Sequence, residues 1–363
     1  MDRKSKSKFF LKNKVFIDSD GIFISSSEKD FLIDLLRSSR AFRIKFQAVS
    51  AVKQSLEIFK MSGDYDSYTF NYAGKKYILK INENSNPAVL QKEFDALNIF
   101  YNKGICPKPV VFFTKDECSI LITSYENGES YQSLGRDSFL YNLEGFAKHL
   151  SFMHETLFDE KFDQTKEYFE YIIDTSDFEK FLSSENMSTL NSDPLFVGYQ
   201  KLKEELISDL KKFLNNYENK KVSLCHLDLK PTNILLRDGF FKICNFKESY
   251  KTDPIFDVIV AVTQNDLQGE SKTSFIKTYY DSFDSEKPSY EEFLENYKSL
   301  ENIYLKLFLL KKLNDRFYEQ ALYEIDRPSK YLTWIENYES IELWVKENVG
   351  DYSDLIENIF YVY

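Results

Sequence analysis

The spacing of apolar residues changes character near Gly128. Before it, residues 46–124 contain short runs in which apolar and polar positions alternate or apolar positions are continuous, separated by turn residues such as Ala73-Gly74. Such runs predict strands joined by hairpins. One helix interrupts them, with Pro87 in its first turn and Gly104 just after its end. We therefore expect this part of the chain to be rich in strands and to contain a single helix.

After Gly128 the apolar positions recur with helical spacing. We expect helices over residues 141–157, 198–216 and most of 263–348, interrupted by one strand–loop–strand stretch at 222–246. The predicted fold class is α+β with two lobes, a small β-rich N-lobe with one key helix and a larger, mostly helical C-lobe. The predicted parts are an N-terminal extension (1–45), the N-lobe (46–126) and the C-lobe (127–363).

Length and composition narrow the class of protein. A chain of 363 residues, 43% of them hydrophobic, is long enough to bury a core, which excludes intrinsic disorder. Its net charge of −11 argues against a nucleic-acid binder. No run approaches the roughly 18 apolar residues of a membrane span, and no signal-peptide core is found. Four cysteines without a C-x-x-C pair favour a reducing, cytoplasmic setting.

The charge is unevenly distributed along the chain. Residues 1–60 carry a basic excess and residues 264–363 an acidic one. We expect the basic start to be a loosely packed arm that offers a surface to a protein partner. The acidic third either attracts a cationic small molecule or is the solvated face of its helices.

The segment Cys225-His226-Leu-Asp228-Leu-Lys-Pro-Thr-Asn233 is the most informative one for chemistry. It fits the phosphotransferase catalytic-loop pattern H-x-D-L-x-x-x-N at every fixed position. In that chemistry a carboxylate accepts the proton of the substrate hydroxyl, and an amide oxygen further along reaches a Mg²⁺ ion on the nucleotide phosphates. The candidate catalytic residues are Asp228 as the base, Asn233 as a metal ligand and His226 as a hydrogen-bonding support of the loop.

With Leu150-Ser-Phe-Met-His154 and Asp253-Pro-Ile-Phe-Asp257, this loop makes the sequence resemble the protein-kinase-like superfamily, and within it the aminoglycoside phosphotransferase / choline kinase family. The resemblance implies transfer of the ATP γ-phosphate, with Mg²⁺, to a hydroxyl group of a small molecule, for which an amine-bearing acceptor is one expectation. No A-P-E motif is present in the sequence. Lys230-Pro231 is also typical of Ser/Thr protein kinases, so protein substrates stay open.

The resemblance also assigns positions in the N-lobe. Lys80 would grip the α- and β-phosphates, and Glu93 on the following helix would orient its ammonium group. Ser62-Gly63 would lie in the phosphate-covering loop, which holds one glycine where the family usually has two. The backbone around Thr123 and Tyr125 would read the adenine edge as the hinge between the lobes.

Asn245 departs from the family pattern. The family expects an aspartate that binds Mg²⁺ after a hairpin, and the hairpin is present at Asp238-Gly239. An amide oxygen at Asn245 can still coordinate Mg²⁺, but it brings no negative charge. The enzyme would then use Asn233 with help from Glu248 or Asp64. The alternative is a catalytically impaired pseudokinase that serves as a binding or structural module.

Overall fold

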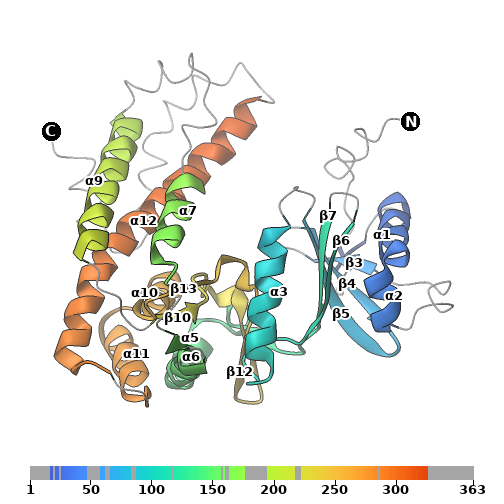
Figure 1. Cartoon of the computed structure of the whole chain (residues 1–363), viewed down its shortest axis with the longest axis horizontal. Coiled ribbons are helices and arrows are strands. Elements are labelled where there is room, and N and C mark those ends of the chain that lie inside the picture. Colours follow the sequence, from blue (N-terminus) through green and yellow to red (C-terminus); the bar gives the residue numbers. More distant parts are fainter. Residues whose placement is uncertain are drawn as a thin grey trace. The chain divides into compact units, whose positions relative to one another are not determined.

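Two units make up the structure, a computed structural model of the whole chain (Figure 1). One unit comprises residues 1–156 and 226–249, and the other comprises 157–225 and 250–363. The boundaries expected at residues 45 and 126 stay predictions. The residues that the structure describes are 17–18, 21–23, 26–46, 58–61, 66–82, 87–115, 118–156, 158–159, 163–175, 194–216, 222–284 and 287–325.

The first unit is built around an antiparallel sheet in the order β1-β2-β3-β4-β5-β7-β6. The predicted hairpin between β4 and β5 is confirmed, with Tyr72 opposite Lys75. Its turn residues Ala73 and Gly74 have φ of 49° and 74°, the left-handed conformation that two-residue hairpins require. The strands are β1 (Ile17–Asp18), β2 (Gly21–Phe23), β3 (Ile58–Lys60), β4 (Asp66–Tyr72), β5 (Lys75–Asn82), β6 (Pro109–Lys115) and β7 (Cys118–Ser124).

Helices cover both faces of this sheet (Figure 1). α1 (Ser26–Ser38) and α2 (Arg40–Phe46) lie on one side, and α3 (Ala88–Tyr101) lies on the other. The last of these confirms the helix expected between Pro87 and Gly104. It rests on β6 and β7 and points its one buried carboxylate, that of Glu93, to the protein interior.

The predicted N-terminal extension (1–45) contains α1 and all of α2 except Phe46, and buried residues of both helices belong to the core of this sheet region. Phe42 is fully buried and its ring stacks on Phe46 with a centroid distance of 4.5 Å. Both rings also contact Phe70 of β4. Phe46 therefore ends a helix rather than starting the strand expected there. The basic start of the chain, residues 1–14, lies outside the described residues.

A smaller antiparallel sheet in the same unit, in the order β12-β11-β8, supports the candidate catalytic loop. Its hairpin turns at Asp238 and Gly239, with φ of 51° and 79°. The backbone N–H of Ile243 donates to the carbonyl of Ile105 at 2.8 Å, which ties this sheet to the segment after α3. The elements are β8 (Glu129–Ser130), β11 (Ile234–Arg237), β12 (Phe240–Ile243), α4 (Tyr131–Leu134), α5 (Arg136–Tyr141) and α6 (Leu143–Thr156).

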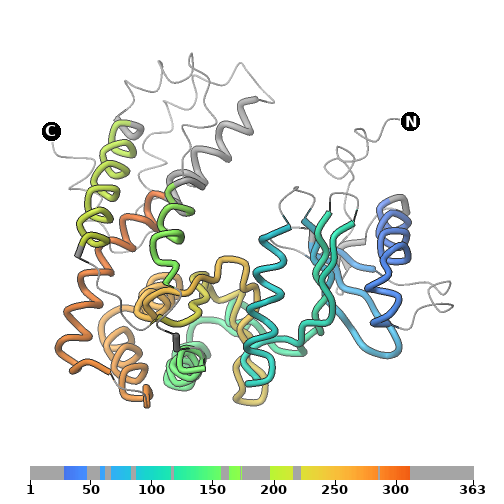
Figure 2. The backbone as a smooth tube through the Cα atoms, in the orientation of Figure 1, coloured from blue at the N-terminus to red at the C-terminus, as the bar shows by residue number. Residues whose placement is uncertain are grey.

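The second unit is mostly helical, with a short sheet in the order β13-β10-β9. α10 is buried along nearly its whole length and packs on α12, which also packs on α9 (Figure 2). No helix among the described residues is long and apolar enough to cross a bilayer. The predicted α+β class is confirmed. The elements are β9 (Phe158–Asp159), β10 (Val222–Cys225), β13 (Tyr250–Thr252), α7 (Thr165–Thr175), α9 (Pro194–Asn216), α10 (Ile255–Gln264), α11 (Gly269–Asp281) and α12 (Tyr290–Ile325).

Candidate active site

β5 and α3 bring a cation and a carboxylate together. Nζ of Lys80 lies 2.6 Å from Oε1 of Glu93, and the Glu93 side chain is only 2% exposed. A carboxylate this deeply buried needs a close counter-charge, because the loss of its hydration is costly. Lys80 supplies that charge. The two residues, thirteen positions apart, therefore meet as the sequence led us to expect.

The loop between His226 and Asn233 holds a carboxylate and an amide side by side. Nδ2 of Asn233 donates to both the main-chain oxygen and Oδ2 of Asp228, at 2.7 and 2.9 Å. A turn of 3-10 helix, η5 (Pro231–Asn233), brings the amide back toward the carboxylate. The five-residue spacing in the motif thus fixes the position of the Asp228 side chain by a local contact.

His226 is hydrogen-bonded to this loop and to the chain just after β12. Its Nδ1 accepts the backbone N–H of Asp228 at 3.2 Å, and its Nε2 lies 2.7 Å from the carbonyl oxygen of Cys244. A ring that accepts at Nδ1 and donates at Nε2 is neutral. The imidazole also packs edge-on against Phe246, with 4.7 Å between the ring centroids. Both nitrogens are engaged, which agrees with the expected supporting role.

Asn245 follows β12 and has a left-handed backbone, with φ of 69° and ψ of 56°. Asparagine is among the few residues other than glycine that adopt this conformation readily. Its Oδ1 accepts a hydrogen bond from Nζ of Lys80 at 3.2 Å, and its Nδ2 lies 3.5 Å from Oδ1 of Asn233. The amide therefore links the Lys80–Glu93 pair to the catalytic loop.

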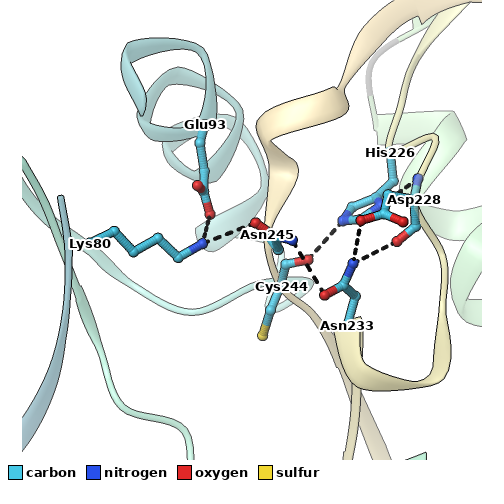
Figure 3. A network of polar contacts seen from close by, with 7 residues as sticks. All are labelled: Lys80, Glu93, His226, Asp228, Asn233, Cys244 and Asn245. Atoms are coloured by element: carbon cyan, nitrogen blue, oxygen red, sulfur yellow. Dashed lines mark hydrogen bonds and ion pairs between the residues drawn. The ribbon is translucent and has the colours of Figure 1, made fainter. Parts of the chain in front are cut away.

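Together these contacts form one polar chain, shown in Figure 3. It runs from Lys80 to Asn245, from Asn245 to Asn233 and from Asn233 to Asp228. Each link has the donor on the Lys80 side and the acceptor on the Asp228 side. All four residues belong to the first unit. The network begins at an ammonium group and ends at a carboxylate, with two neutral amides between them.

The resemblance implies a Mg²⁺ ion near Asn233 and Asn245, but their donor set does not fit a cation held by the protein. Both candidate oxygens are neutral. Oδ1 of Asn245 accepts from the Lys80 ammonium group, and Oδ1 of Asn233 faces the amide N–H₂ of Asn245. Mg²⁺ and similar hard cations are bound in proteins chiefly through carboxylates. Of the two substitute carboxylates that the sequence suggested, Glu248 lies in η6 (Phe246–Glu248), which directly follows Asn245, and Asp64 is outside the described residues.

A second lysine stands beside the candidate base. Nζ of Lys230 is 3.4 Å from Oδ2 of Asp228, and its side chain is 35% exposed. In the sequence, Lys230 is distinctive only as part of the Lys230-Pro231 dipeptide that is typical of Ser/Thr protein kinases. Because Lys230 follows Asp228 by only two residues in a short loop, its charge could have been expected near the Asp228 carboxylate.

The other predicted nucleotide contacts lie outside this polar chain. Thr123 is buried on β7 opposite Ile78, and Tyr125 follows the same strand and donates its backbone N–H to Lys76 at 3.2 Å. Ser62 and Gly63 lie outside the described residues.

The carboxylate of Glu248 in η6 affects the pKa of Lys92 on α3. Burial lowers the pKa of Lys92 to about 8, and the charge of Glu248 partly opposes this shift. Glu248 therefore interacts electrostatically with α3.

Comparison with known proteins gives a consistent set of relatives. The model of a family described as "Phosphotransferase enzyme family" matches residues 60–293. Protein LicA of Haemophilus influenzae is 24% identical over 217 residues, which are 58% of this chain and 73% of that protein.

Three solved structures are similar in fold. The choline kinase LicA from Streptococcus pneumoniae has a TM-score of 0.54 and 18% identity, covering 83% of this chain and all of that one. A structure of LicA in complex with AMP has a TM-score of 0.54 and 17% identity, with the same coverage. An ethanolamine kinase from Plasmodium vivax has a TM-score of 0.54 and 18% identity, covering 86% of this chain and 87% of that one.

Proposed function

Because this chain belongs to the phosphotransferase enzyme family, we propose that it transfers the γ-phosphate of ATP to a hydroxyl group of a small molecule. The observation that carries the proposal is the polar chain from Lys80 through Asn245 and Asn233 to Asp228. It holds an ammonium group and a carboxylate in one network, and phosphoryl transfer to a hydroxyl needs a cation for the phosphates and a base for the proton. The structure of LicA in complex with AMP supports a nucleotide as the donor.

Asp228 is the proposed general base. Its carboxylate accepts the proton of the acceptor hydroxyl while the hydroxyl oxygen forms a bond to the γ-phosphorus. The bond from that phosphorus to the bridging oxygen breaks, and ADP leaves with the electron pair. Asn233 and His226 act through Asp228 and are positioning residues, since they hold its carboxylate and its backbone.

Lys80 is the proposed phosphate-binding residue, with Glu93 as the carboxylate that orients it. Ser62, Gly63, Thr123 and Tyr125 stay proposed contacts of the phosphates and the adenine. Mg²⁺ as a cofactor also stays a prediction. Since the two amides do not fit a protein-held cation, we assign no step of the transfer to one.

A cationic acceptor fits the proposal. The solved neighbours are named choline and ethanolamine kinases, and both of those substrates pair an amine or ammonium group with a hydroxyl. The net charge of this chain is −11, with an acidic excess over residues 264–363 that favours approach of cations. Choline should therefore compete for the acceptor site better than a neutral polyol.

A second candidate function is favoured by Asn245. Neutralising the phosphate charge supplies much of the catalysis in this reaction, and the amide contributes none of the negative charge that would hold a metal ion for that purpose. A chain with this residue could have kept the fold as a binding module without turnover.

The test is acceptor-dependent ADP release by the full chain, with ATP and Mg²⁺ and with choline, ethanolamine, an aminoglycoside or a neutral polyol offered in turn. Asp228→Asn should reduce the rate by about 100-fold or more, because the base is removed. Asp238→Asn is the matched control, since this carboxylate lies on an exposed turn with 82% of its side chain accessible. No release with any acceptor would exclude the transferase and favour the second candidate.

A further inference from the structure

The direction of the Asn245 amide is determined by its neighbours. Lys80 presents only hydrogen-bond donors, so the amide must turn its oxygen toward Nζ, 3.2 Å away. Its N–H₂ group then faces Oδ1 of Asn233, at 3.5 Å. Flipping the amide would set N–H groups against an ammonium group and oxygen against oxygen. Neither contact would be favourable, so one orientation is strongly preferred (Figure 3).

This orientation changes what the site presents to a cation. An aspartate at position 245 would offer two acceptor oxygens, one to Lys80 and one to a metal ion beside Asn233. Asn245 instead directs partly positive hydrogen atoms at the oxygen of Asn233 that would share the ion. A divalent cation placed there would meet a donor group and no carboxylate from this residue.

Two lysine side chains, rather than a metal ion, supply positive charge at the site. Lys80 stands at one end of the polar network and Lys230 beside its other end, 3.4 Å from Oδ2 of Asp228. Their side chains are 19% and 35% exposed, so neither lysine is fully buried. Lysine ammonium groups bind phosphate oxygens as point charges. Two of them near one site can partly replace the charge that a metal ion would bring.

We propose that this chain binds a nucleoside triphosphate through Lys80 and Lys230 without requiring a divalent cation. The proposal rests on the proposed function in one respect, namely that this polar network is the nucleotide site. It goes further by naming the two lysines that hold the triphosphate. It also gives Asn245 as the reason why binding needs no divalent cation.

The experiment is calorimetric titration of the full chain with ATP, once with Mg²⁺ and once with EDTA. In the wild type the two dissociation constants should agree within about threefold, because Asn245 adds no charge that would favour a metal ion. Asn245→Asp should make binding depend on Mg²⁺, with affinity at least about tenfold higher with the ion than with EDTA. Asn98→Asp makes the same chemical change at an exposed position of α3 and should behave like the wild type.

The lysines are tested separately. Lys230→Met should weaken ATP binding in EDTA by about tenfold, since one of two phosphate-binding charges is lost. An unchanged affinity would remove Lys230 from the proposal.

The outcomes separate this inference from the proposed function. Wild-type binding of ATP only with Mg²⁺ would overturn the inference and leave the phosphotransferase proposal standing. No binding of ATP under either condition would overturn both. If Asn245→Asp fails to fold, as judged by circular dichroism, the wild-type comparison of Mg²⁺ and EDTA still decides.

Discussion

Oδ1 of Asn245 accepts a hydrogen bond of 3.2 Å from the ammonium group of Lys80, although 165 positions separate the two residues. The contact joins the end of β12 to β5 across the first unit. Because an amide carries no charge, the counter-charge of Lys80 comes from Glu93, whose Oε1 is 2.6 Å away. The orientation of Lys80 therefore depends on one ion pair and one hydrogen bond to a neutral acceptor.

Replacing Glu93 with Gln should weaken ATP binding. Glutamine keeps the shape of the side chain but loses the charge-assisted bond that holds Nζ, and such bonds contribute about 1.5–3 kcal/mol. We expect the dissociation constant for ATP to rise about tenfold or more, measured by calorimetry. Glu144→Gln, on the exposed surface of α6, is the matched control. A folded Glu93→Gln protein with wild-type affinity would contradict this role.

The packing of α2 on the seven-stranded sheet should contribute to the stability of the protein. Phe42 is fully buried between α2 and the sheet, so Phe42→Ala should lower the free energy of unfolding by about 3–5 kcal/mol. Ile44 lies on the same helix with 67% of its surface exposed, and Ile44→Ala should change the value by about 0.5 kcal/mol at most. Urea unfolding of both variants checks the pair. Equal effects would show that α2 does not pack on the sheet in solution.

Acid should destabilise the protein partly through His149 of α6. Burial, with a smaller effect of the Lys242 charge, lowers the pKa of this imidazole to about 4 in the folded protein from 6.5 in the unfolded chain. Between these pH values the unfolded state binds more protons, so the free energy of unfolding falls as the pH drops through this window. The contribution lost between pH 7 and pH 5 is roughly 2 kcal/mol.

Urea unfolding at pH 7 and pH 5 measures this loss. His149→Gln removes the titrating group, so the variant should lose less stability than the wild type over the same interval. Other groups titrate in both proteins, and the difference between the two losses isolates His149. Equal losses would show that its pKa is not lowered by burial.

Local patterns were predictable from the sequence. The motif predicted that Asp228 and Asn233 belong to one site, and the structure has Nδ2 of Asn233 2.9 Å from Oδ2 of Asp228. The helix after Pro87 and the hairpin at Ala73-Gly74 were also found. Each depends on residues that are close along the chain.

Contacts between distant segments were harder to foresee. Phe46 was expected to begin a strand, but its ring is needed in the aromatic core beside Phe42 and Phe70, and it ends a helix instead. Tertiary packing outweighed local propensity there.

The amino-acid sequence alone indicated a phosphotransferase, because the motif residues and their order along the chain supply a carboxylate, an amide and a lysine. It also determined that an amide replaces a carboxylate at position 245. Only the tertiary structure decided which way that amide points and that Lys230 lies beside Asp228. A hydrogen bond has a direction, and the direction at Asn245 is set by Lys80, a partner that folding brings from a distant strand.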